Sequence, residues 1–188
     1  PGAWGTNINL PLLPGTGDEG LHRLYDGLIS HILEDFKPEL IINSAGQDNH
    51  FSDPLASMAV TAQGYARLAD KLQADIAVLE GGYSVECALP YVNTGIILAM
   101  AGMDYSKVLE PDLSELRKQD PRCNKRVDQL IEQVGDLYFN RERTKKELLQ
   151  KCNGVWQRKK HIYYDEEGIR EQQVETVRYC SICDGYFT

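Results

Sequence analysis

Residues 44–55 hold side chains whose types and spacing could do chemistry. Asp48, His50 and Asp53 place two carboxylates and an imidazole within six residues, directly after a short apolar run. A carboxylate held in a partly dry site needs a counter-charge, and a divalent metal ion supplies one. The same side chains also suit turns, in which they cap backbone groups of the loop. Composition alone favours the turn interpretation and leaves the metal interpretation open.

A second segment, residues 79–84, reads Leu-Glu-Gly-Gly-Tyr-Ser. Paired glycines after a strand allow unusual backbone angles and close approach, and they leave the next side chain exposed at the sheet edge. Tyr83 placed there could donate a hydrogen bond to a developing oxyanion. The alternative is a tight strand-to-helix turn followed by a packed aromatic ring.

A third candidate lies near the carboxyl end, where Cys180 and Cys183 precede an Asp-Gly turn. This spacing is half of a zinc ribbon, in which two thiolates on one turn share a metal ion. Two more ligands are needed, and neither the other cysteines nor His161 has convincing spacing, although a partner chain could supply them. The alternative is a pair of reduced cysteines in a small hairpin. Five cysteines without secretory features argue against a disulfide framework.

Short apolar runs alternate with helical patterns in the first part of the chain. Helices are predicted over 18–36, 61–72 and 85–101, and buried strands over 40–42 and 76–79. In the third helix, Pro90 either interrupts the helix or marks a late start. This alternation is typical of a parallel sheet covered by helices on both faces. Functional loops follow the carboxyl ends of such strands, so residues 43–54 and 80–84 are expected to meet at one edge.

Taken together, three blocks of the sequence resemble a known family. Residues 9–18, 44–55 and 79–83 are similar, in order and spacing, to successive blocks of the histone deacetylase and acetylpolyamine amidohydrolase superfamily. The resemblance covers roughly residues 1–105 and matches the carboxyl-terminal half of that family's catalytic domain. It implies a three-layer α/β/α fold with a parallel sheet of the arginase/deacetylase type, of which this chain holds a part.

The resemblance also implies roles for individual residues. It makes Asp48 one of three protein ligands to a catalytic Zn²⁺, and Tyr83 the catalytic residue that polarises the acyl carbonyl. Family members with histidine at the tyrosine position are poor deacetylases, so Tyr83 indicates an active one. Gly81 and Gly82 are expected to line the substrate channel.

Supporting roles fall to His50, a common family histidine beside the metal loop, and to Asp53. Gln47 departs from the family, which usually has phenylalanine there, so either the packing beneath the metal loop or the shape of the channel is expected to differ. The family's other metal ligands and its histidine general base lie upstream of the first block. None of the four histidines present matches them.

The resemblance thus implies a zinc-dependent deacetylase, an amidohydrolase acting on acetyl-lysine or acetylpolyamine-like amines. This chain would supply one metal ligand and the catalytic tyrosine, would need the missing amino-terminal half as a partner, and would be inactive alone. A half-sheet exposes edge strands and apolar surface, so oligomerisation is also open. The alternative is a non-catalytic assembly or interaction module with a zinc-ribbon-like tail.

Charge divides the chain into three predicted parts: a deacetylase-like 1–110, a charged helical segment 111–154, and a β-hairpin tail 155–188 with the CxxC. Residues 1–110 carry 5 Lys+Arg against 14 Asp+Glu, whereas 111–160 carry 13 against 8. The basic stretch suggests nucleic acid, but interleaved glutamates favour a solvated face instead. No apolar run could cross a bilayer, and the first residues show no signal-peptide pattern, so no membrane partner and a cytoplasmic location are expected.

Overall fold

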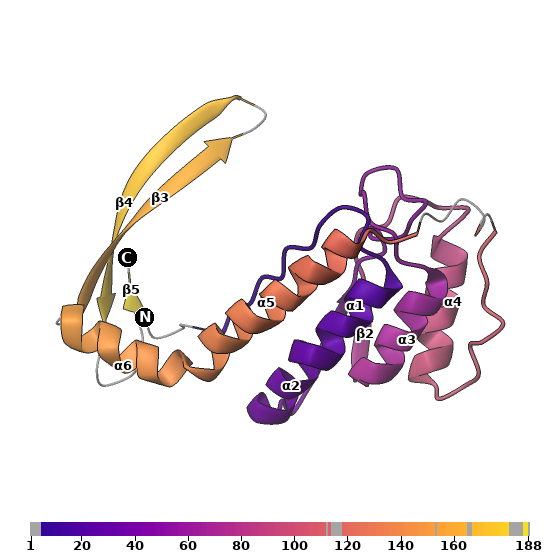
Figure 1. The fold of residues 1–188 in the computed structure, drawn as a ribbon, viewed down its shortest axis with the longest axis horizontal. Helices are drawn as coiled ribbons and strands as arrows, with labels where there is room; N and C mark the ends of the chain where they lie inside the picture. Colours follow the sequence, from indigo (N-terminus) through magenta and orange to yellow (C-terminus); the bar gives the residue numbers. More distant parts are fainter. Residues whose placement is uncertain are drawn as a thin grey trace. The chain divides into compact units, whose positions relative to one another are not determined.

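The structure is a computed structural model that describes residues 5–111, 113, 118–152, 154–164, 167–180 and 186–187 (Figure 1). The chain forms two compact units. The larger unit is Leu10–Gly135, and the hairpin unit combines Pro1–Asn9 with Asp136–Thr188. The domain boundaries expected near residues 110 and 154 stay a prediction.

The larger unit begins with the predicted helix over 18–36, which the structure confirms. It consists of α1 (Asp18–Leu24), a π-helical turn (η1, Tyr25–Ile29) and α2 (Ser30–Phe36) without a break. Two acidic residues lie in the first turn, where their negative charges interact favourably with the positive end of the helix dipole.

Two parallel strands form the sheet of the larger unit, as predicted. β1 (Ile42–Ala45) pairs with β2 (Ile76–Leu79), with Ala45 opposite Leu79 at the carboxyl end. β1 starts later than the predicted 40–42 run and extends into the polar segment. Side chains on both strands remain exposed, with Ile42 at 56% and Leu79 at 73%. Parallel sheets are normally buried on both faces, so this pair is only part of a complete sheet.

Two further helices, α3 (Ala62–Leu72) and α4 (Leu89–Met100), lie side by side (Figure 1). Small residues on α3 and branched residues on α4 form the core between them: Ala62, Ala69, Val92 and Ile96. Of the two alternatives for this helix, the late start marked by Pro90 is confirmed, because the helix begins at Leu89 and Pro90 lies in its first turn, where the missing N–H costs nothing.

The segment predicted to be helical beyond residue 110 contains α5 (Pro121–Phe139). Val127 and Leu130 are buried against Leu24 and Leu28 of the first helical stretch. Pro121 is the first residue of this helix, a position at which proline is tolerated because its missing N–H would have no partner there.

The hairpin unit contains α6 (Arg141–Cys152) and a three-stranded antiparallel sheet in the order β3-β4-β5. Its strands are β3 (Val155–Tyr164), β4 (Ile169–Tyr179) and β5 (Tyr186–Phe187). The predicted hairpin is confirmed, with Tyr164 paired to Ile169 and Gly168 at φ 65° in the turn.

The structural zinc site expected at Cys180 and Cys183 stays a prediction, because Cys183 lies outside the described residues. Across the residues described, no helix is both long enough and apolar enough to cross a membrane.

Candidate active site

The loops that follow β1 and β2 meet at the carboxyl edge of the two strands, as predicted. The backbone amide of Gln47 donates a hydrogen bond of 2.5 Å to the carbonyl oxygen of Gly81. This bond continues the parallel pairing to residues two positions beyond Ala45 and Leu79. The Ser44–Leu55 segment and the glycine pair therefore form one site.

Asp48 and Tyr83 both lie against Gly81. A Cβ atom built on Gly81 would lie 2.8 Å from Asp48 Oδ2 and 3.6 Å from the Tyr83 hydroxyl oxygen. Any side chain at this position would displace the carboxylate, so the closeness of the two groups requires glycine. Within the described residues, the Asp48 carboxylate accepts no hydrogen bond and forms no ion pair.

Asp53 fixes the backbone that carries the tyrosine. Its Oδ2 accepts a hydrogen bond of 2.8 Å from the Tyr83 amide, and its Oδ1 accepts one of 2.9 Å from the Leu55 amide. Burial alone would raise the pKa of this carboxyl. The hydrogen bonds from Tyr83, Leu55, Ala56 and Ser84 outweigh burial and hold the pKa below its usual value. Asp53 therefore stays ionised and links the two loops, while the Tyr83 side chain remains 51% exposed.

His50 lies beneath the site and does not face it. Its side chain is fully buried, with Nε2 3.3 Å from Glu110 Oε1 and Nδ1 2.9 Å from the Ser52 hydroxyl. The Ser52 hydroxyl is in turn 2.8 Å from the Ser84 hydroxyl, next to Tyr83. A chain of polar side chains, buried at Glu110 and His50 and partly buried at Ser52 and Ser84, thus runs from Glu110 to the glycine loop.

Glu110, at one end of these connected polar side chains, was not among the residues predicted from the sequence. Its Oε1 also accepts a hydrogen bond of 2.9 Å from the Ala62 amide at the start of α3. Burial would raise the pKa of Glu110, but the bonds from His50 and from that amide hold it below its usual value. Glu110 follows His50 by sixty residues, and it sits in no local motif that could have revealed it.

Gln47, the departure from the family, packs behind the glycine pair. Its side chain is buried, and its amide nitrogen donates a hydrogen bond to Asn93 on α4. Gly82 has φ 148°, and a Cβ atom built there would lie 3.0 Å from Gln47 Cβ. Gln47 therefore supports the glycine loop from below and leaves the Asp48 carboxylate in place.

The site fits a metal ion in one respect. The Asp48 carboxylate is half-buried, lies beside two glycines and has no partner among the residues that the structure describes, which suits a ligand to a divalent cation. No group of three or more His, Cys, Asp or Glu side chains in the described part of the chain could hold a metal. These residues therefore provide one ligand of the set that such an ion needs.

Comparisons with known proteins point to one family. The model of the histone deacetylase domain matches residues 2–99. A probable deacetylase of Archaeoglobus fulgidus is 52% identical over 129 residues, which are 62% of this chain and 36% of that protein. A histone deacetylase-like amidohydrolase of Pseudomonas aeruginosa is 30% identical over 146 residues, or 70% of this chain and 38% of that one. The chain therefore spans little more than a third of the length of these relatives.

The fold is confirmed by solved structures. The HDA15 HD domain superimposes with a TM-score of 0.59 at 22% identity, covering 78% of this chain and 39% of that one. The histone deacetylase Clr3 gives a TM-score of 0.59 at 17% identity, covering 86% of this chain and 30% of that one. With the family model matching more than half of its residues, the chain belongs to the histone deacetylase family.

Proposed function

We propose that this chain supplies one zinc ligand, Asp48, and the catalytic residue, Tyr83, to a zinc-dependent deacetylase. The substrate class is an acyl amide of the acetyl-lysine or acetylpolyamine kind. One observation carries the proposal: the Asp48 carboxylate and the Tyr83 hydroxyl lie against the same residue, Gly81, beyond the ends of two parallel strands. In such sheets this edge is where ligands bind.

The side chains have separate tasks in this proposal. Asp48 would hold the zinc ion, which when bound supplies a Lewis acid and lowers the pKa of a water molecule. The Tyr83 hydroxyl would donate a hydrogen bond to the acyl oxygen as negative charge develops on it. Asp53 would keep the Tyr83 backbone in register for that contact, and Gly81 and Gly82 would line the channel for the acyl group.

The remaining ligands and the general base belong, in this proposal, to the part of the family domain that this chain does not match. Two observations support it. The described residues provide no cluster of three metal ligands, and apolar side chains of both strands are exposed where a longer sheet would cover them. The amino-terminal half of the domain is therefore the proposed partner, and the chain without it is expected to be inactive.

A direct test measures acetate released from an acetyl-lysine peptide and from N-acetylputrescine by the purified complete protein. We expect turnover that a zinc chelator abolishes and that added zinc restores, because the ion stabilises charge that the protein alone does not. The ratio of the two rates would identify the substrate class. Turnover that survives complete removal of zinc would contradict the proposal, as would a zinc-loaded protein that releases no acetate from either substrate.

A further inference from the structure

The two faces of the hairpin β3–β4 differ in charge. Paired residues of antiparallel strands point to the same side, and alternate residues point to opposite sides. The register pairs Lys159 with Val174, His161 with Gln172 and Tyr163 with Arg170. We call the side that carries these residues the basic face; it consists of Val155, Gln157, Lys159, His161, Tyr163, Arg170, Gln172, Val174, Thr176 and Arg178.

The opposite side, here the paired face, neutralises its own charge. Glu175 accepts hydrogen bonds from Arg158 and, at 3.1 Å, from Lys160. These two bonds hold the pKa of Glu175 below its usual value, and the bond from Arg158 has the larger effect. Glu171 accepts a hydrogen bond of 3.2 Å from the Tyr164 hydroxyl on the same face. Cations and carboxylates are therefore matched on this side.

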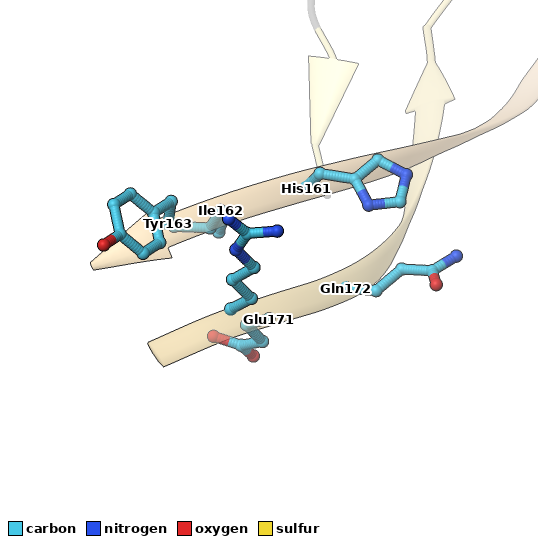
Figure 2. A pocket seen from close by; sticks show the side chains of 6 residues that line it. His161, Ile162, Tyr163, Glu171 and Gln172 are labelled. Carbon is cyan, nitrogen blue, oxygen red and sulfur yellow. The ribbon is translucent and has the colours of Figure 1, made fainter. Parts of the chain in front are cut away.

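The basic face has no such match. Its ten residues include three cations, Lys159, Arg170 and Arg178, and no carboxylate. Tyr163 is 59% exposed, and the Arg170 guanidinium lies 5.5 Å from the centre of its ring. A hollow on the hairpin is lined mainly by residues of this face, and Ile162 and Glu171 of the paired face also contribute to it. Figure 2 shows His161 and Gln172 on the two paired strands, with Tyr163 further along β3.

Charge also distinguishes the unit that carries this face. The hairpin unit has 10 Lys+Arg against 9 Asp+Glu, whereas the larger unit has 10 against 19. An anionic ligand is therefore repelled less by the hairpin unit than by the larger one. The sequence had suggested a solvated basic stretch, but the register divides that stretch: Arg158 and Lys160 are ion-paired, and Lys159 lies on the other side.

We propose that the basic face binds single-stranded nucleic acid. Phosphates would contact Lys159, Arg170 and Arg178, because single strands are bound through cations that follow the backbone. The exposed Tyr163 ring offers a surface on which a base can stack, and only an unpaired base can reach it in this way. Neutral polar side chains between the cations, those of Gln157 and Gln172, can donate to sugar and base edges.

The test is fluorescence anisotropy of a labelled oligothymidylate of about 20 nucleotides with the complete protein at about 50 mM salt. Three phosphate contacts predict a slope of log K against log salt of about −2. The double variant Lys159→Gln/Arg170→Gln should weaken binding at least about tenfold and flatten this slope. Its matched control, Arg158→Gln/Lys160→Gln, removes the same charge from the paired face and should leave binding nearly unchanged.

A second pair separates stacking from charge. Tyr163→Ala should weaken binding about 10–100-fold, whereas Tyr164→Ala on the paired face should not, since loss of one stacked base costs about 1–3 kcal/mol. Circular dichroism confirms that each variant keeps its fold. The proposal is overturned if the wild type does not bind, or if both members of a pair weaken binding equally. Preference for duplex DNA or for phosphatidylserine vesicles over the single strand would also overturn it.

Discussion

Replacing Tyr83 with phenylalanine is expected to lower kcat for acetyl-lysine hydrolysis by about 10²–10³-fold, the usual cost of removing one oxyanion donor. The hydroxyl lies near the Asp48 carboxylate, at the edge where the acyl oxygen would bind. The Tyr83 hydroxyl forms no hydrogen bond within the described residues. In the proposal, it is therefore free to donate its hydrogen bond to the acyl oxygen of the substrate. KM should change little, because a contact made mainly in the transition state affects kcat.

The variant should remain folded, because the Tyr83 ring is half exposed. A matched control is Tyr105→Phe, which removes a hydroxyl that lies 3.4 Å from Asp70, away from the glycine loop. We expect this control to keep wild-type turnover. A Tyr83→Phe enzyme as fast as the wild type, or an equal loss in both variants, would show that Tyr83 is not catalytic.

Replacing Glu110 with alanine is expected to destabilise the larger unit by about 3 kcal/mol or more. The Glu110 side chain is fully buried and is shared by the His50 ring and the Ala62 amide. Removing it leaves two buried polar groups without their acceptor, each at about 1–3 kcal/mol, and creates a cavity. The urea midpoint should fall by about 1–3 M, given typical denaturant slopes.

Urea unfolding of the larger unit should be followed by circular dichroism at 222 nm. Tryptophan fluorescence is unsuitable, because both tryptophans, at positions 4 and 156, belong to the hairpin unit. The control is Glu110→Gln, which keeps the shape and the acceptor oxygen and should cost far less. Equal midpoints for Glu110→Ala and the wild type would mean that the buried chain to Ser84 does not stabilise this region.

Local patterns were enough to predict the elements and the meeting of the two loops. Apolar residues at helical spacing predicted the helix over 18–36, and two short apolar runs predicted the parallel pair β1 and β2. Because strand ends in a parallel sheet share one edge, the positions of Asp48 and Tyr83 followed from the strands that precede them. Their common contact with Gly81 then needed only the known freedom of glycine.

The connections beneath the site could not be predicted from spacing. Asp53 holds the Tyr83 amide across thirty residues, and Glu110 reaches His50 across sixty. Such contacts depend on how the loops fold back on one another. Glu110 is a single glutamate before a proline, and it belongs to no periodic sequence pattern from which its contact could be predicted. The hairpin shows the same limit in a milder form. Its turn could be predicted from the sequence. That Lys159 and Lys160 lie on opposite faces with different charge became clear only from the register of β3 with β4.

The most direct test of the account is native mass spectrometry of the complete protein, wild type and Asp48→Asn, with bound zinc counted in each. The comparison uses the difference in zinc content between the two proteins. A zinc ion bound elsewhere, for example at the cysteines at 180 and 183, is present in both and does not affect this difference. The account predicts that the wild type carries one more zinc ion than the variant, because asparagine keeps the shape of Asp48 but not its charge. Equal zinc content in the two proteins would contradict the assignment of Asp48 as a metal ligand and, with it, the proposed active site.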